Sequence, residues 1–410
     1  MIVLYILIAI LLFGLLIFVH ELGHFLVARW CGVQINEFAI GMGPKIFSKV
    51  SKKTGTRYSL RAFPIGGYVS MLGEDESPES RKYKDQKPEK KPFSSFVTET
   101  VPVDDEDAPV DETNTEISEP GEEDEAQTPE KDPDPRSYAN KKVWQRILIC
   151  LAGPAVNILL GFICMTVVVI MTKAYASNVI AKFSEEGATS NIETVFEDGT
   201  RGDALKEGDR VIKVGNTSVH TGNELVYEIM YKGIKPLNLT VIRDGNRVLL
   251  HNVVFPTYTD EESGTVFAEY DFYVMAEEKN VGNTLKHGFW QSVSTVKMVL
   301  DSIGGLFTGR IGIKAVSGPV GITKTIADAA STSFMNVFYL FTVITINLGV
   351  MNLLPVPALD GSKLVFLAIE GIRGKPVKKE VEGYIHLAGM AVLIVFMIFI
   401  TVKDVTGLFG

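Results

Sequence analysis

The sequence His20-Glu21-Leu22-Gly23-His24 directly follows an apolar run that extends from Ile2 to Val19. A run of this length is about what a helix needs to cross a bilayer. On a helix, His20 and His24 are four residues apart and point to one side, so both imidazoles can share one metal ion, and Glu21 stands where a general base would stand. Ionisable residues at membrane depth imply function by default. The stretch therefore predicts a zinc hydrolase built into a membrane.

A simpler interpretation of the same stretch is a helix end with two interfacial histidines and a solvated glutamate. The flanking residues argue against this interpretation, because 15–19 and 25–28 are apolar and the first cation beyond them is Arg29. The two histidines are therefore expected inside the membrane rather than in water, where a polar side chain is costly unless it has a role.

The composition of the 410-residue chain bounds its class. The hydrophobic fraction of 46% is high for a chain that also carries a long acidic stretch, and the net charge of −9 is concentrated in that stretch. Nothing in the composition indicates a nucleic-acid partner. The three cysteines form no C-x-x-C motif, so a disulfide framework is not expected. The N-terminus lacks a basic segment and a small-residue cleavage site, so it is interpreted as a retained membrane helix rather than a signal peptide.

Four segments are apolar and long enough to span a membrane, and the charges between them predict their orientation. The segments are, in order, about residues 4–28, 147–171, 334–356 and 385–402. The first and third connecting segments carry lysines and arginines beside the membrane, which predicts that they are cytoplasmic. The second connecting segment, about 172–333, and both termini are then extracytoplasmic. The expected fold class is a polytopic α-helical membrane protein with four transmembrane helices.

The first connecting segment has two parts of different composition. Residues 31–76 are punctuated by glycines, with 38–44 typical of strand, turn and strand and 58–63 alternating with period two. We expect these β elements to lie against the cytoplasmic side of the helices, because irregular backbone at membrane depth must be covered by protein. Residues 77–133 are rich in acidic residues, Pro, Ser and Thr and predict a disordered insert. This insert is either a solvated segment without function or a regulatory tail.

The second connecting segment predicts a compact extracytoplasmic α+β domain over residues 174–280, with its core at about 187–255. Residues 203–216 are typical of a short helix, a glycine corner, a strand and a turn, and 237–250 of a hairpin with a tight Asp-Gly turn. Residues 284–307 place apolar side chains at helical spacing, which predicts an amphipathic helix. That helix lies either along the membrane face or against the protein as an ordinary packing helix.

A catalytic zinc site needs three protein ligands and an open position for water, so the two histidines require a third residue. Asp360 is the best candidate, because it ends the stretch Asn352-Leu353-Leu354-Pro355-Val356-Pro357-Ala358-Leu359-Asp360 after the third apolar segment. The charges of the connecting segments predict that the first and third helices cross the membrane in the same direction. Asp360 and the histidine pair are then expected at the same side of the membrane. Asn347 and Asn352 either bind substrate backbone or hold helices together. Pro355 and the proline two residues later break the helix and free carbonyl groups near the metal.

These residues together predict hydrolysis of a peptide bond at membrane depth. Zinc would lower the pKa of a water toward neutrality and polarise the scissile carbonyl, and Glu21 would take the proton and deliver it to the leaving amine. A substrate helix pairs its amides internally, so it must unwind before attack. A substrate strand added to the β elements near Gly66 and Gly67 would hold it extended.

At this point the chain resembles the site-2 protease family of intramembrane zinc metalloproteases, specifically the bacterial regulator-of-sigma-E type. The resemblance covers about residues 1–75 and 135–410. Its motifs are F-V-H-E-L-G-H at 18–24, G-M-G-P at 41–44, P-I-G-G-Y-V at 64–69, A-G-P-A-V-N at 152–157, S-G-P-V-G-I at 317–322 and the stretch at 352–361. The chain departs from the family at Ser362-Lys363, where Gly-His is common, and in its acidic insert.

The resemblance implies zinc ligands His20, His24 and Asp360 and a catalytic Glu21. It also implies that the extracytoplasmic domain is a single PDZ-like module, which filters or docks substrates already trimmed outside the membrane. The implied location is the bacterial plasma membrane, with the active site toward the cytoplasm. The implied substrates are transmembrane segments of anti-sigma factors, signal-peptide remnants or pheromone precursors, and the sequence does not choose among them.

The predicted organisation follows the chain in nine segments. They are a first membrane helix with the histidine pair (1–30), a membrane-associated β region (31–76), the acidic insert (77–133), a juxtamembrane segment with the second membrane helix (134–173), the α+β domain (174–280), an amphipathic helix with a connector (281–333), the third membrane helix (334–361), a cytoplasmic loop (362–382) and the fourth membrane helix (383–410).

Two other function classes compete with an intramembrane protease. The first is a non-catalytic membrane scaffold, whose PDZ-like domain captures exported peptides and whose metal site is structural. An intact Glu21 favours the enzyme, because a structural zinc site needs no neighbouring base and usually has four closed ligands. The second is a transporter, which would show paired inverted repeats with broken helices. The two halves of the sequence show no such repeat.

Overall fold

Long apolar helices form the membrane part of the chain. The computed structural model describes residues 2–74, 134–184, 188–261 and 263–409, so the predicted insert at 77–133 lies outside the described residues. Within the described part, four helices are long and apolar enough to cross a membrane: α1 (Ile2–Trp30), α3 (Val143–Met171), α7 (Phe334–Asn352) and α9 (Lys379–Phe409). The predicted number of membrane helices is confirmed at this level of length and composition, and the protein is a multi-pass membrane protein.

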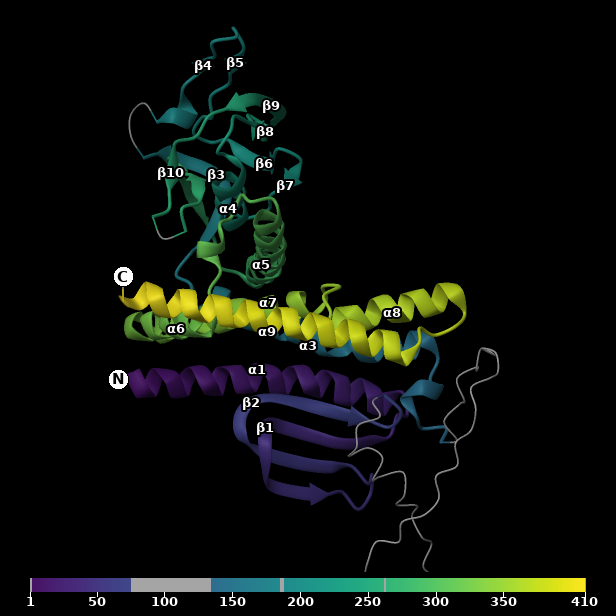
Figure 1. Ribbon diagram of the computed structural model, residues 1–410. Helices are drawn as coiled ribbons and strands as arrows, with labels where there is room; N and C mark the ends of the chain where they lie inside the picture. The colour runs from purple at the N-terminus through teal and green to yellow at the C-terminus, as the bar shows by residue number, and fades with distance from the viewer. Residues whose placement is uncertain (1, 75–133, 185–187, 262, 410) are drawn as a thin grey trace, which may run out of the picture.

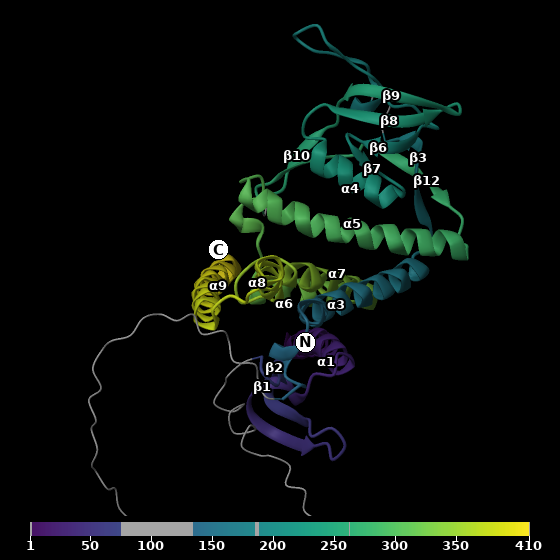
Figure 2. The same cartoon turned by 90° about the vertical axis from the view of Figure 1, so that its right-hand side faces the viewer.

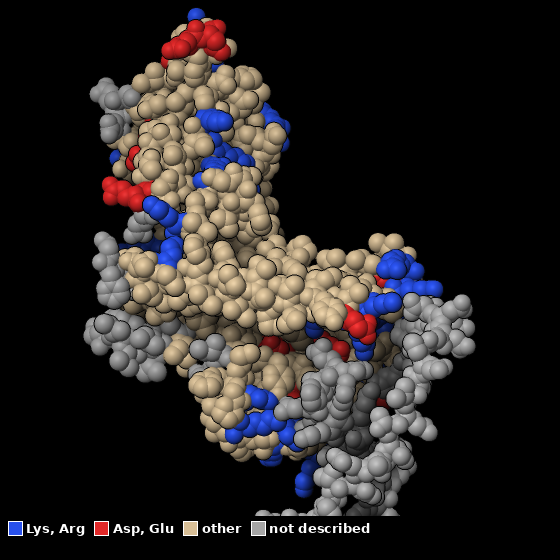
Figure 3. All heavy atoms as spheres, viewed as in Figure 1, with Lys and Arg blue, Asp and Glu red and all other residues tan. Residues whose placement is uncertain are grey.

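Helix α3 is the central member of this layer. It packs against α1 and against α7, and the long helices have roughly aligned axes (Figures 1 and 2). Both chain termini lie at one end, so α1 runs away from that end and α9 runs toward it. Glycine permits the close contact of α3 with α7, because a Cβ at Gly349 would lie 2.7 Å from the Ile158 side chain. On the face in Figure 3, uncharged side chains cover most of the helical layer, as a lipid-facing surface requires.

Strands β1 (Ile35–Val50) and β2 (Arg57–Met71) form an antiparallel hairpin beside α1 (Figure 1). The strand, turn and strand expected over 38–44 are instead part of one continuous strand. Gly41 and Gly43 have φ angles of 86° and 85°, so the chain bends within β1 without leaving the sheet. The hairpin curls on itself, because Phe38 pairs with both Tyr58 and Val69. Residues 67–71 are therefore an edge of the sheet that pairs, among the described strands, only with β1.

Residues 175–277 form the predicted α+β domain. Its main sheet has the order β12-β3-β6-β8-β9, with β7 paired to β6, and helix α4 covers it. The bounds are β3 (Tyr175–Phe183), β6 (Arg210–Val214), β7 (Thr217–Ser218), α4 (Gly222–Lys232), β8 (Leu237–Arg243), β9 (Asn246–Val253) and β12 (Phe272–Glu277). The β8–β9 hairpin confirms the Asp-Gly turn, whereas the short helix expected after residue 203 is absent. The buried core includes Ile180 and Phe272, so it extends beyond 187–255 on both sides.

The predicted amphipathic helix is α5 (Val281–Phe307), and it holds this domain above the membrane helices (Figure 2). Lys297 of α5 lies 2.7 Å from the buried Glu228 of α4 and 2.6 Å from Asp301, and the Tyr227 hydroxyl donates to Asp301 at 2.9 Å. Burial alone lowers the pKa of Lys297, but its bonds to Asp301 and Glu228 raise the pKa above its ordinary value. The helix also contacts α3, so the domain is fixed to the bundle rather than tethered.

The remaining elements connect these parts. Residues 362–382, expected as a loop, instead contain most of α8 (Asp360–Arg373), and the connector before α7 contains α6 (Pro319–Thr332). An ion pair between Arg146 and Glu370 fastens α8 to α3. The shorter elements are β4 (Thr194–Val195), β5 (Arg201–Gly202), β10 (Thr257–Thr259), β11 (Val266–Ala268) and the 3-10 turns Tyr138–Asn140, Thr189–Asn191 and Ile313–Ala315.

Replacing Lys297 by methionine is expected to loosen the α+β domain from α5. The change removes one of two cations from the buried Glu228 carboxylate, and an unsatisfied buried polar group costs about 1–3 kcal/mol. We expect a lower thermal midpoint for the purified chain and faster limited proteolysis between β12 and α5. The control is the same substitution at the exposed Lys235, and equal proteolysis of the two variants would contradict this coupling.

Candidate metal centre

Three potential metal ligands meet between α1 and the start of α8. His20 and His24 project from one side of α1, and their Nε2 atoms lie 3.2 Å apart. Asp360 Oδ2 lies 3.0 Å from His20 Nε2 and 3.2 Å from His24 Nε2. Both histidines are 8% exposed, so the group is largely removed from solvent. The structure therefore brings together the three residues that were predicted from segments about 340 residues apart, and they could hold a metal ion.

The donor set fits zinc. Ligand atoms held tetrahedrally at about 2.0–2.2 Å from zinc lie roughly 3.3–3.5 Å from one another. The three observed separations are within a few tenths of an ångström of that spacing. Two imidazoles and one carboxylate leave a fourth position open, which is the composition of a catalytic rather than a structural zinc site.

The remaining ring nitrogens of both histidines have partners on α3. His24 Nδ1 lies 2.8 Å from the Ile149 carbonyl oxygen, which can only accept, so the ring proton is on Nδ1 and Nε2 is free for a metal. His20 Nδ1 faces the amide of the fully buried Asn157, whose Nδ2 is 3.3 Å away and whose Oδ1 has no partner. An amide can present either end, and a metal on His20 Nε2 selects the orientation in which Oδ1 accepts from Nδ1.

Two glycines allow α1 and α3 to approach closely enough for these contacts. A Cβ at Gly23 would lie 2.5 Å from the Ala152 carbonyl oxygen, and a Cβ at Gly153 would collide with His24 Nε2 itself. From the sequence, residues 152–157 were recognised only as a family motif, and these roles were not predicted. The available signal was an asparagine in an apolar helix, one turn after a Gly-Pro pair.

A cavity of about 260 Å³ opens beside the three ligands. Its lining comes from α1, α7 and the segment before α8, and consists of Ile17, His20, Glu21, Leu348, Asn352, Ala358, Leu359 and Asp360. Glu21 therefore borders the same space as the three potential ligands. The edge of β2 also reaches this place, since a Cβ at Gly67 would lie 3.3 Å from Glu21 Cγ.

The other predicted site residues occupy different positions. Asn352 lines the cavity, whereas Asn347 is exposed on α7 and is not among the cavity residues. Pro355 is exposed, and Gly66 adjoins the Met42 side chain rather than Glu21. The departure at Ser362-Lys363 produces an ion pair, because Lys363 Nζ lies 2.8 Å from Glu74 Oε1. That pair joins the start of α8 to the end of the β hairpin without touching the three ligands.

Comparison with known proteins shows that this chain is similar to metalloproteases. A match to peptidase family M50 covers residues 8–396. The regulator of sigma-W protease RasP of Bacillus subtilis is 32% identical over 441 residues, with 98% of each chain covered. The zinc metalloprotease RasP of Geobacillus kaustophilus is also 32% identical, with 98% of this chain and 97% of the relative covered.

Replacing Gly153 by alanine is expected to displace the His24 ring and abolish metal binding. Alanine is the better helix former by about 1 kcal/mol, so the backbone of α3 should not be weakened. We expect elemental analysis of the purified variant to show less than a tenth of the wild-type zinc. Gly304→Ala, with open space around the glycine, is the matched control. A Gly153→Ala variant with full zinc occupancy would contradict the placement of His24.

Proposed function

This chain belongs to peptidase family M50 and is a zinc metalloendopeptidase, and from that premise we propose that it cleaves peptide bonds within the membrane. The observation that supports this proposal is the meeting of two histidines and an aspartate at the cytoplasmic ends predicted for α1 and α7. His20 and His24 belong to a candidate membrane helix, which supports a reaction at membrane depth. The scissile bond must therefore come from a substrate that is itself in the bilayer.

We propose that His20, His24 and Asp360 hold the zinc and that Glu21 is the general base. When bound, zinc supplies a Lewis acid that acidifies water and polarises a carbonyl. Glu21 borders the cavity beside the ligands, where it can take a proton from the attacking water and deliver it to the leaving amine. Ile149 and Asn157 fix the orientation of the two imidazoles.

The edge of β2 formed by residues 67–71 supports a role in holding the substrate. A transmembrane helix pairs its own amides, so attack requires a locally extended segment. Residues 67–71 pair on one side with β1 and pass beside Glu21. We propose that the unwound substrate segment adds to this edge as a further strand, which replaces the backbone hydrogen bonds lost on unwinding.

The substrate class follows from the depth of the site and from the relatives. RasP of Bacillus subtilis is named as a regulator of sigma-W. We propose that this chain likewise cleaves the transmembrane segments of anti-sigma factors, and signal-peptide remnants, once their outer parts have been removed. The first and third connecting segments carry positive charges beside the membrane, which supports an active site toward the cytoplasm in the bacterial plasma membrane.

We propose that the domain at 175–277 is PDZ-like and lies outside the membrane, where it filters or docks trimmed substrates. It has an apolar groove of about 720 Å³ between α4, β12 and α5, with aromatic side chains along it. The principal aromatic lining residues are Tyr227, Tyr231, Phe267, Tyr270, Phe272 and Tyr273. The ion pairs of Lys297 hold this groove at a fixed place relative to the membrane helices, which suits a size filter.

Replacing Glu21 by glutamine is expected to abolish cleavage while zinc is retained. The amide keeps the size of the side chain but cannot accept the proton, and loss of a general base typically costs 10²–10⁴-fold or more in rate. The measurement is cleavage by the detergent-purified chain of a single-span substrate without its outer domain, with zinc quantified in the same samples. Cleavage by the variant at the wild-type rate would exclude Glu21 as the base, and absence of zinc from the wild type would exclude the site.

Proline at the edge of β2 tests the added strand. Successive residues of a strand direct their backbone N–H groups to opposite sides, and proline has no N–H group. One of the two variants Val69→Pro and Ser70→Pro therefore removes a backbone donor that points away from β1. We expect the outward-facing variant to raise KM about tenfold for a transmembrane substrate and to keep its zinc. Lys49→Pro, on the segment at the opposite edge of the sheet, is the control. Unchanged cleavage by both test variants would rule out strand addition.

A further inference from the structure

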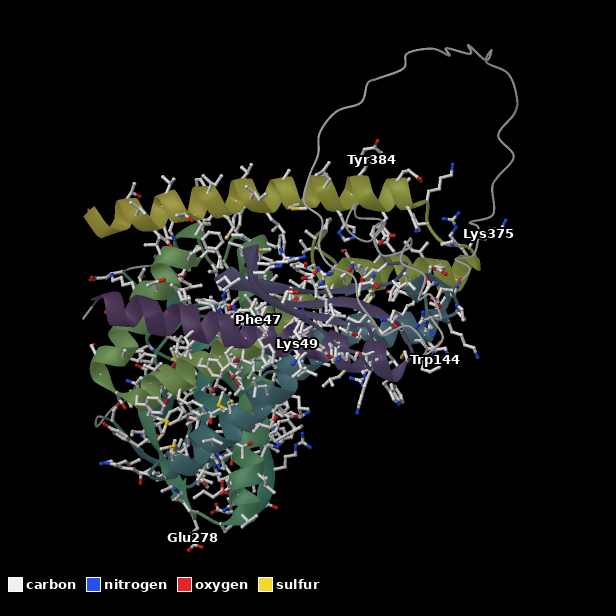
Figure 4. All side chains as sticks on the ribbon, turned by 90° about the horizontal axis from the view of Figure 1, so that it is seen from below. Phe47, Lys49, Trp144, Glu278, Lys375 and Tyr384 are labelled. Atoms are coloured by element: carbon white, nitrogen blue, oxygen red, sulfur yellow. The ribbon has the colours of Figure 1, made fainter. Side chains whose placement is uncertain are left out.

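Helix α9 makes little contact with the other described parts of the chain except at two places. Only 6% of its apolar span is buried, compared with 28%, 44% and 39% for the spans in α1, α3 and α7. Figure 4 shows α9 along one side of the bundle, with Tyr384 pointing away from the other helices. Near its C-terminal end, Asp404 accepts from the backbone N–H groups of Gly318 and Gly321 at 2.8 Å each. The second place of contact is near the metal centre.

That second contact joins α9 to the segment between α7 and α8. Gly389 packs directly on Pro357, and a Cβ at position 389 would collide with the proline ring. One turn earlier, His386 Nδ1 accepts a hydrogen bond from the Ala358 N–H at 3.1 Å. The His386 ring also lies against Phe366 of α8, with 5.8 Å between ring centroids. Two neighbouring residues of the segment are thus held from the same face of α9.

The segment held in this way is strained and carries a metal ligand. Ala358 has a φ angle of 74°, a left-handed conformation that side chains other than glycine rarely adopt. Such a conformation persists only where its surroundings impose it. The N-cap of α8, Leu359, has no side-chain cap that could impose it locally. Ala358 lines the active-site cavity, and the ligand Asp360 follows two residues later.

We propose that His386 and Gly389 are positioning residues for the metal centre, because they fix the conformation of 357–359 and thereby the place of the Asp360 carboxylate. This inference rests on the proposed role of Asp360 as a zinc ligand. Helix α9, which supplies none of the three proposed ligands, then determines whether the Asp360 carboxylate reaches His20 and His24. Residues 357–359 lie between a contact from α9 on one side and the cavity on the other.

The first test replaces Gly389 by leucine and compares it with Gly383→Leu. Both glycines are in α9, six residues apart, so the two substitutions change the helix propensity in the same way. They differ in the contact with Pro357, because a Cβ added at Gly383 would meet no atom within 4 Å. The measurements are zinc content and the rate of zinc loss to a chelator in the detergent-purified full chain. We expect Gly389→Leu to lose zinc at least tenfold faster than wild type and Gly383→Leu to match wild type.

The second test examines His386 with a conservative pair. His386→Leu removes the acceptor for the Ala358 N–H, whereas the side-chain oxygen of His386→Asn can accept in place of Nδ1. We expect faster zinc loss in the leucine variant and at least partial rescue in the asparagine variant, with unchanged size-exclusion elution for both. Wild-type zinc retention in Gly389→Leu and His386→Leu would overturn this inference and leave the proposed function intact. A wild-type chain that binds no zinc would overturn both.

Discussion

The three donor atoms of the proposed metal site come from two distant parts of the chain and must converge within a multi-pass membrane protein. His20 and His24 share one side of α1 by helical spacing alone, but Asp360 reaches them only because α7 ends and the chain turns beside α1. Buried polar groups of this kind are costly unless each is satisfied. The close packing of α1 on α3, the break after α7 and the docking of α9 all serve that convergence.

Close backbone approach is the means by which α3 serves the site. Gly23 and Gly153 remove the side chains that would separate the two helices, and the space is used by the His24 ring and its bond to the Ile149 carbonyl. The same contact between α1 and α3 therefore packs the two helices and orients the His24 ring. A change that widens the helix interface by one methyl group alters the chemistry of the site, although the protein could remain folded.

Two parts of the chain lie outside the helical layer, namely the β hairpin and the α+β domain. Residues 67–71 of the β hairpin, which pair only with β1 among the described strands, pass beside Glu21. The α+β domain is fastened to α5 through the ion pair of Lys297 with the buried Glu228, so its apolar groove is held at a set position with respect to the bundle. Under the proposed function, a substrate would pass this domain and then be extended at the β edge, so it would be selected by size and by the ease of unwinding.

The sequence by itself determined what depends on local order. Hydropathy predicted the four membrane helices, the four-residue spacing placed two imidazoles together, and the charges beside the helices predicted that Asp360 would lie on the same side.

The tertiary structure decided what depends on contacts between distant residues. Asn157 and Gly153 have no local pattern that identifies a partner on α1. Residues 38–44 stay within one strand because β2 pairs with 38–40 on both sides. Residues 362–382 are largely helical rather than a loop because α8 has α3 to pack on. Local periodicity reports which face of an element is apolar, but it carries no information about which other element will cover that face.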